Sequence, residues 1–204
     1  MLKYPCLVLD HDDTVVQSEA TINYPYFCYI LDVFRPGATI TLSDYICGCS
    51  SEGFVGMCRN RFNFTDAELE EEYRGWKEYI RSHAPAPYPG IDRIIRRQKE
   101  EGGIICVVSQ SAQENILRDY RAHFGIEPDE VYGWDLAPEH RKPNPWALEQ
   151  IMEKYGKIDV LVNNAGITKD GLMIESIKKT YWGIDQIAVT FSYAFDLKKK
   201  GGKK

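Results

Sequence analysis

Three short apolar runs, each leading into a polar residue, constrain the fold of this chain most. They are CLVL before Asp10, IICVV before Ser109 and VLV before Asn163-Asn164. Runs this short and this apolar are typical of strands buried on both faces of a parallel sheet. Segments with helical spacing separate them, so the alternation predicts an α/β fold built around such a sheet.

The same pattern predicts where a site lies. Parallel strands place their carboxyl ends along one edge of the sheet, and open α/β sheets bind their ligands beyond that edge. Asp10, Ser109 and the Asn163-Asn164 pair all follow the last residue of a predicted strand. We therefore expect these side chains to lie near one another.

A long helical segment interrupts the alternation between the first two strands. Residues 17–83 are mostly helical in pattern, and Thr65-Asp66-Ala67-Glu68 has the form of a capping box that opens a helix to about Ser82. The breaker-rich stretch from Pro85 to Gly90 marks a boundary. The pattern predicts a core of residues 1–16 and 88–204 with a helical domain inserted at 17–87.

Further helices and strands are expected to alternate within the core. The predicted helices cover residues 91–100, about 112–124 and 145–155, and the predicted strands cover 131–134 and 186–195. Gly102-Gly103, Gly125 and Gly156 follow the three helices and are typical of helix ends.

The net charge and the composition of the chain limit the kinds of partner that we expect it to bind. The 204 residues carry a net charge of −5 although five lysines lie within the last seven residues. The body of the chain is therefore acidic and offers no basic face to nucleic acid. No apolar run is long enough to span a bilayer, and no signal peptide precedes the first strand. We expect a cytoplasmic protein, a monomer or weak dimer, with neither nucleic-acid nor membrane partners.

The segment Asp10-His11-Asp12-Asp13-Thr14 carries the strongest chemical signal. Three carboxylates packed between apolar residues repel one another unless a proton or a cation offsets their charge. A hard divalent cation with oxygen ligands suits that task. Two carboxylates spaced i, i+2 can also divide catalysis, one as nucleophile and the other as proton carrier.

With these residues in view, the chain resembles the haloacid dehalogenase (HAD) superfamily. LVLDHDDTVV is similar to the first signature of that family, an apolar strand followed by D-x-D-x-T, and CVVS ending at Ser109 is similar to the second. Arg141-Lys142-Pro143 resembles the third, a Lys before a helix. Order and spacing resemble the phosphoglycolate phosphatase and β-phosphoglucomutase branch over roughly the first 155 residues.

The resemblance implies a Rossmann-like parallel-sheet HAD core with an inserted helical cap. It also implies a magnesium-dependent phosphatase, or a mutase, of a small phosphorylated metabolite. Asp10 would attack phosphorus, and Asp12 would protonate the leaving oxygen and then activate water. Ser109 and Lys142, with Gln110 beside them, would bind the phosphoryl oxygens. Magnesium would be held by the Asp10 carboxylate, the Asp12 backbone carbonyl and Asn164.

The end of the third apolar run departs from that family. There the family has a pair of acids that complete the magnesium site, whereas this chain has Asn163-Asn164. Residues 157–173 instead resemble the N-N-A-G segment of short-chain dehydrogenases, most of all the 3-oxoacyl-carrier-protein reductases. Yet the glycine-rich dinucleotide loop of those enzymes is missing after the first strand, and the Tyr-x-x-x-Lys pattern, Tyr73 to Lys77, precedes N-N-A-G instead of following it.

Three functional hypotheses stay open at this point. The first is the magnesium-dependent phosphatase. The second is a catalytically impaired or designed chimeric HAD-like scaffold that lacks the acidic fourth signature. The third is a nicotinamide-dependent reductase, against which the missing glycine-rich loop argues. Phosphatase assays with and without magnesium separate the first two, and nicotinamide binding tests the third.

Overall fold

Five parallel strands form the single sheet of the computed structural model, which describes residues 4–162 and 184–188. Their bounds are β1 Cys6–Leu9, β2 Ile104–Val108, β3 Glu130–Tyr132, β4 Ile158–Val162 and β5 Ile184–Ala188. The strands lie in the order β3-β2-β1-β4-β5, and every neighbouring pair is parallel. The predicted α/β fold with a parallel sheet is confirmed.

Two strands differ from their predicted bounds. β3 ends at Tyr132 rather than Trp134, because the chain leaves the sheet there to meet the loop after β2. The Trp134 N–H donates to the Ser111 carbonyl at 2.8 Å, and a Cβ on Gly133 would lie only 2.6 Å from that same oxygen. β5 begins at Ile184 rather than Gln186, and residues 189–195 of the predicted strand lie outside the described part of the chain.

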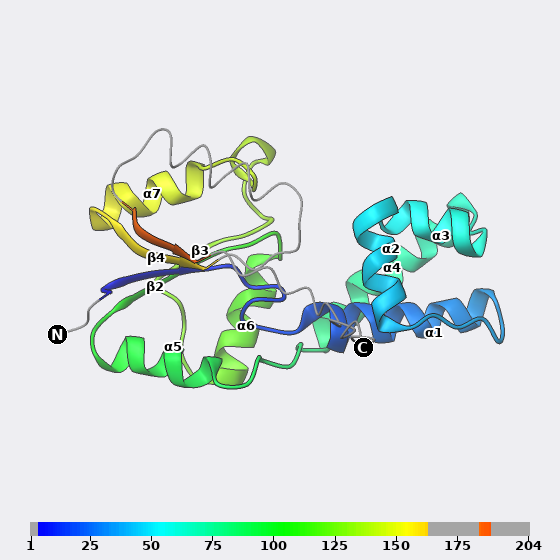
Figure 1. The fold of residues 1–204 in the computed structure, drawn as a ribbon, viewed down its shortest axis with the longest axis horizontal. Coiled ribbons are helices and arrows are strands. Elements are labelled where there is room, and N and C mark those ends of the chain that lie inside the picture. Colours follow the sequence, from blue (N-terminus) through cyan, green and yellow to red (C-terminus); the bar gives the residue numbers. More distant parts are fainter. Residues whose placement is uncertain (1–3, 163–183, 189–204) are drawn as a thin grey trace, which may run out of the picture.

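The core helices follow the predicted pattern closely. They are α5 Ile91–Glu100, α6 Gln113–Phe124 and α7 Trp146–Tyr155, and a short 3-10 helix, η2, spans Pro138–His140. β1 buries Cys6 and Val8 against α7 on one face of the sheet, and Leu7 and Leu9 face α5 and α6 on the other. This alternation is the two-residue period of a strand, and it gives the three layers seen in Figure 1.

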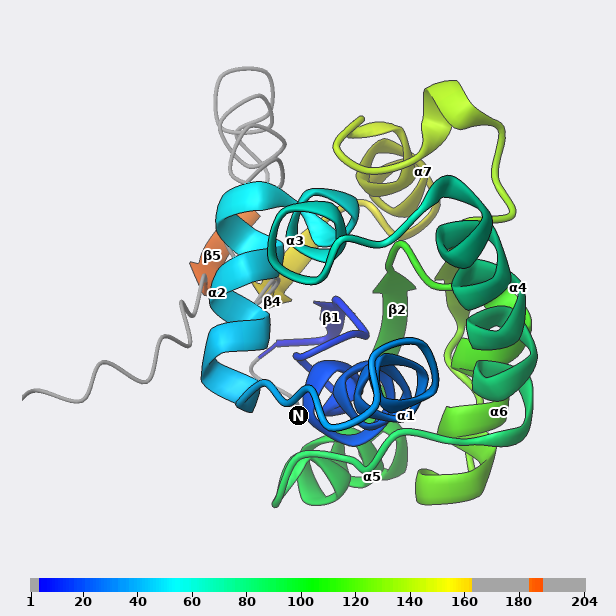
Figure 2. The same ribbon diagram turned by 90° about the vertical axis from the view of Figure 1, so that its right-hand side faces the viewer.

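The segment between β1 and β2 is helical throughout, apart from its connecting loops. It comprises a π-helical turn, η1 Glu19–Asn23, and the α-helices α1 Tyr24–Phe34, α2 Leu42–Glu52, α3 Phe54–Phe62 and α4 Asp66–Ser82. The predicted capping box opens α4, with Thr65 and Glu68 each accepting the backbone N–H of the other. Figures 1 and 2 show these helices as a group beside the sheet.

The inserted helices have an aromatic core of their own. Phe27 is almost fully buried at its centre, and its ring lies 5.2 Å from Tyr45 and 5.7 Å from Phe54. Phe62 and Phe64 pack against the same ring. Because this cluster is distinct from the two clusters that flank the sheet, the insert has a separate source of stability.

The two segments that connect the insert to the core lie side by side. The Gln17 N–H donates to the Ala86 carbonyl at 2.8 Å, and the Tyr88 N–H donates to the Val15 carbonyl at 3.0 Å. These bonds tie the insert to the segment that follows β1, so it sits next to the carboxyl end of that strand. Among the described residues, no helix combines the length and apolar character needed to cross a membrane.

Candidate active site at the carboxyl edge of the sheet

Asp10 lies directly after β1, at the centre of the sheet. Its backbone N–H donates to the Val162 carbonyl of β4 at 2.9 Å, and its Oδ1 lies 3.1 Å from Lys142 Nζ. Both side chains are almost fully buried, at 4% and 3% exposure. Burial raises the pKa of Asp10, Lys142 opposes that rise, and the nearby Asp12 adds to it.

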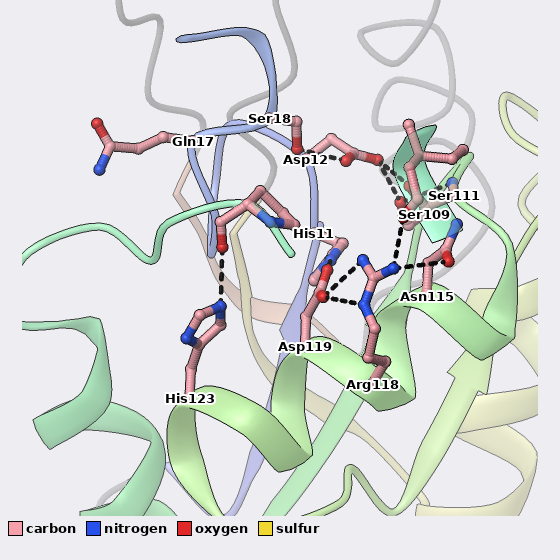
Figure 3. Close-up of polar contacts among 12 residues, drawn as sticks. His11, Asp12, Gln17, Ser18, Ser109, Ser111, Asn115, Arg118, Asp119 and His123 are labelled. Carbon is pink, nitrogen blue, oxygen red and sulfur yellow. Dashed lines mark hydrogen bonds and ion pairs between the residues drawn. The ribbon is translucent and has the colours of Figure 1, made fainter. Parts of the chain in front are cut away.

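Asp12 is held by three hydroxyl groups. Ser18 Oγ donates to Oδ1 at 2.6 Å, and Ser111 and Ser109 donate to Oδ2 at 2.6 and 3.2 Å. The three hydroxyl groups fix the position and orientation of this carboxylate. Figure 3 shows the serines approaching Asp12 from the loops that follow β1 and β2.

A tight turn after β1 brings the two carboxylates together. The N–H groups of Thr14, Val15 and Val16 all point to the His11 carbonyl, at 2.9–3.3 Å. Asp13 has φ of 49°, a left-handed conformation that Asp and Asn tolerate better than most residues. Burial raises the pKa of Asp13 to about 6, although the Glu19 N–H that donates to it opposes that rise.

His11 lies in the loop after β1 and is almost fully buried. Its Nε2 lies 3.0 Å from Asp119 Oδ2, and both side chains are 1% exposed. Arg118 binds the other oxygen of Asp119 at 2.8 Å, and the His11 ring stacks on Tyr120. The contacts of His11 and Arg118 with Asp119, shown in Figure 3, connect the turn after β1 to α6.

The structure brings together most of the residues expected at the site. Asp10, Asp12, Ser109 and Lys142 converge at the carboxyl edge of the sheet, through Asp10–Lys142 and Asp12–Ser109 contacts. Gln110 is exposed, and none of the hydrogen bonds described for the resolved part of the chain links it to them. Asn164, expected as a metal ligand, lies outside the described residues.

Ser18 and Ser111 were missed by the sequence analysis. Ser18 lies six residues beyond Asp12 and Ser111 two residues beyond Ser109, and both donate to Asp12 at 2.6 Å. The repeat Ser109-Gln110-Ser111 at a strand end was the one available signal. Their roles depend on how the two loops fold back, which no local pattern encodes.

The site supplies part of what a divalent cation needs. Asp10 and Asp12 provide oxygen ligands, which magnesium favours, and Lys142 forms an ion pair with Asp10. Within residues 4–162 and 184–188, no group of three or more His, Cys, Asp or Glu residues is arranged to hold a metal ion. The donors present fit magnesium in kind.

Comparison with known sequences points to one family. The family model of the short chain dehydrogenases matches residues 90–192. A 3-oxoacyl-(acyl-carrier-protein) reductase of Thermotoga maritima is 54% identical over 93 residues, which are 46% of this chain and 37% of the reductase. That of Haemophilus influenzae is 32% identical over 104 residues, 51% of this chain and 41% of the enzyme. The chain thus spans well under half of the length of these relatives.

Comparison with solved structures identifies proteins that share the fold of this chain. A hydrolase from Streptococcus pneumoniae has a TM-score of 0.69 at 17% identity, over 94% of this chain and 95% of that one. A HAD-superfamily hydrolase of Geobacter sulfurreducens has a TM-score of 0.63 at 16% identity, over 85% and 83% of the two chains. CbbY of Rhodobacter sphaeroides, solved with xylulose-(1,5)-bisphosphate, has a TM-score of 0.61 at 15% identity, over 92% and 87%.

These two likenesses concern different properties of the chain. The solved structures resemble this chain in fold, and their sequence identities of 15–17% show the fold alone. The family model matches residues 90–192, so the sequence resemblance to the short chain dehydrogenases covers much more of the chain than the expected 157–173. By this match to half of its residues, the chain belongs to the short chain dehydrogenase family, and it carries that sequence on a HAD-like fold.

Proposed function

We propose that this protein is a magnesium-dependent phosphatase that hydrolyses a small phosphorylated metabolite through an aspartyl-phosphate intermediate. The observation that carries the proposal is the buried Asp10–Lys142 pair at the carboxyl edge of the sheet, with Asp12 two residues away. A carboxylate beside a fixed ammonium group provides both a nucleophile and a charge that binds phosphoryl oxygens. The cap, residues 17–87, would cover this site, and residues 1–16 and 88–204 would form the core.

In the first step, an Asp10 carboxylate oxygen attacks phosphorus, and the bond from phosphorus to the leaving oxygen breaks. Asp12 gives a proton to that oxygen, so the product leaves as an alcohol. Asp12 must therefore carry a proton when substrate binds, and the hydroxyls of Ser18 and Ser111 can then accept as well as donate. Lys142 neutralises the charge that grows on the phosphoryl oxygens.

In the second step, Asp12 takes a proton from water, and the oxygen of that water attacks phosphorus. The Asp10–phosphorus bond breaks, inorganic phosphate leaves, and Asp10 returns to its carboxylate form. Ser109 turns its hydroxyl from Asp12 towards the phosphoryl group, and Gln110 is available from the same loop. Transfer of the phosphoryl group to a second substrate hydroxyl in place of water would make the enzyme a mutase.

Magnesium is the cofactor that we propose for this site. The Asp10 carboxylate, the Asp12 backbone carbonyl and the side-chain oxygen of Asn164 would hold it. A bound magnesium ion would supply positive charge for the phosphoryl oxygens and would offset the repulsion between Asp10 and Asp12. A neutral amide at residue 164 gives weaker binding than a carboxylate does.

The sequence family of residues 90–192 suggests a nicotinamide-dependent reductase as a second candidate. A dinucleotide pyrophosphate needs glycines after the first strand, because the backbone must approach it closely. Residues 10–36 contain no glycine, and the turn after β1 places carboxylates where the pyrophosphate would lie. Charge repulsion therefore favours the phosphatase, with a catalytically impaired scaffold as its alternative.

The experiment that tests this proposal measures the hydrolysis of a phosphomonoester by the purified protein in the presence of magnesium. Asp10→Asn should abolish turnover, because an amide is not a nucleophile towards phosphorus. Asp13→Asn is the matched control: it makes the same change three residues away, at a left-handed position that Asn tolerates. We expect Asp13→Asn to stay within about threefold of wild type. Equal turnover by Asp10→Asn and wild type would contradict the proposal, and binding of a nicotinamide nucleotide would favour the reductase.

A further inference from the structure

The helical insert contains a cavity of about 370 Å³, a size typical of small-molecule sites. Two carboxylates, Glu19 and Glu72, line it together with the aromatic side chains of Tyr45, Phe54 and Trp76. None of the described residues that line the cavity is basic. The cavity thus combines negative charge with aromatic faces.

Glu72 is the more unusual of the two carboxylates. Its side chain is 6% exposed, and within the described residues no hydrogen bond or ion pair satisfies its carboxylate. Burial alone raises its pKa to about 7. Withdrawing a carboxylate from bulk water costs free energy, and a cationic ligand in the cavity that Glu72 lines would offset that cost.

Glu19 meets the same cavity from η1. Its Oε1 accepts a hydrogen bond from Asn23 at 3.0 Å, whereas its Oε2 is buried with no partner in the described part of the molecule. Burial and then the charge of Asp13 raise its pKa to about 7. Two incompletely satisfied carboxylates from different elements therefore converge on one cavity.

We propose that this cavity binds an ammonium group, so that the substrate of the proposed phosphatase is a small phosphomonoester bearing a cationic amine. Glu19 and Glu72 supply the opposite charge, and the ring of Trp76 supplies a face for cation–π contact. This inference rests on the proposed function only where it calls the ligand a substrate. The binding of the ammonium group itself depends only on the cavity.

The position of the cavity suits the leaving group of such a substrate. Asn23 and Trp76 line both this cavity and a smaller one of about 60 Å³ that also contains Asp12. Trp76 Nε1 donates to Asn23 Oδ1 at 2.9 Å, so this pair forms the partition between the two. A substrate with its phosphoryl group at Asp10 and its leaving oxygen at Asp12 would extend past this pair towards Glu72.

Choline and 3,3-dimethylbutan-1-ol make a matched pair of probes, because they have the same shape and differ in charge alone. Neither carries a phosphoryl group, so their binding does not depend on Asp10 or Lys142. We expect calorimetry to show choline binding about tenfold or more tightly than its neutral isostere. Glu72→Gln should remove most of that preference, and Glu70→Gln, an exposed change on the same helix, should leave it intact.

The phosphate esters of the same two alcohols then connect binding to turnover. A choline preference that depends on Glu72 supports the inference even if neither ester is hydrolysed, in which case the proposed function alone fails. Equal affinity for choline and its isostere, or a preference that Glu72→Gln leaves unchanged in a variant with wild-type circular dichroism, overturns the inference whether or not hydrolysis occurs.

Discussion

At the scale of single residues, the site depends on how buried charges are balanced. Asp10 is paired with Lys142, Asp12 is held by three hydroxyls, and Glu72 has neither arrangement. The ion pair and the three hydroxyl groups offset the cost of burying Asp10 and Asp12. Glu72 is left as a carboxylate whose protonation is coupled to folding.

Glu72 therefore gives a pH-dependent stability. Its pKa is raised in the folded state, so the folded protein holds a proton that the unfolded chain releases between its ordinary pKa, about 4.5, and about 7. The unfolding free energy should fall as pH rises through that window. Glu72→Gln should remove this loss and stabilise the protein at pH 8 by about 1 to 3 kcal/mol relative to wild type.

Urea denaturation at pH 5 and pH 8 measures this effect, with Glu70→Gln as the exposed control on α4. The control should follow wild type at both pH values. If Glu72→Gln destabilises the protein equally at both, Glu72 has a partner that offsets its burial, and the coupling described here is wrong.

The sequence predicted the residues at strand ends and missed those brought in by loops. Asp10 and Ser109 follow apolar runs, and the parallel sheet necessarily places them at one edge. Ser18 and Ser111 reach Asp12 only because the chain turns at Asp13, whose positive φ no periodicity encodes. Glu72 looked like one of many acids on α4, since burial of that position depends on packing between helices.

At the scale of elements, β4 has a sequence that resembles the reductases and lies beside the strand that ends at Asp10. It lies beside β1, with Leu7 opposite Val160, and Asp159 Oδ2 accepts the Cys6 N–H at 2.7 Å. The Val162 carbonyl accepts the Asp10 N–H. A strand with reductase-like sequence thus supports the candidate nucleophile, because a parallel strand is specified by apolar residues and backbone hydrogen bonds that both families share.

The turn after β4 is where the two families differ in chemistry. A carboxylate near a divalent cation is worth a few kcal/mol more than a neutral amide at an effective dielectric of about 20. Asn164→Asp should therefore tighten magnesium binding by about two decades and raise the phosphatase rate. Asn163→Asp adds the same charge one residue earlier and should have a smaller effect. Equal magnesium affinity in calorimetric titrations of wild type and Asn164→Asp would show that residue 164 is not a ligand.

At the scale of the whole molecule, the sequence predicted the layers of helices and sheet better than the order of the strands and the packing of the helices. Helical and strand periods indicated a parallel sheet covered by helices and a helical insert, because these follow from local patterns of apolar residues. The strand order β3-β2-β1-β4-β5 depends on pairing between distant segments, which those patterns do not specify. The cavity within the insert likewise forms where η1, α2, α3 and α4 pack together.

The arrangement of the whole molecule gives the account its central claim, that a HAD-like fold presents Asp10 as a nucleophile to a phosphoryl group. The most direct measurement is to mix the protein with a phosphomonoester and magnesium, quench the reaction in acid and locate covalent phosphate by peptide mass spectrometry. If Asp10 is the nucleophile, the peptide that contains Asp10 should carry a phosphoryl group, and the corresponding peptide of Asp10→Asn should carry none. Hydrolysis without phosphate on that peptide, or phosphate on another residue that persists in Asp10→Asn, would contradict it.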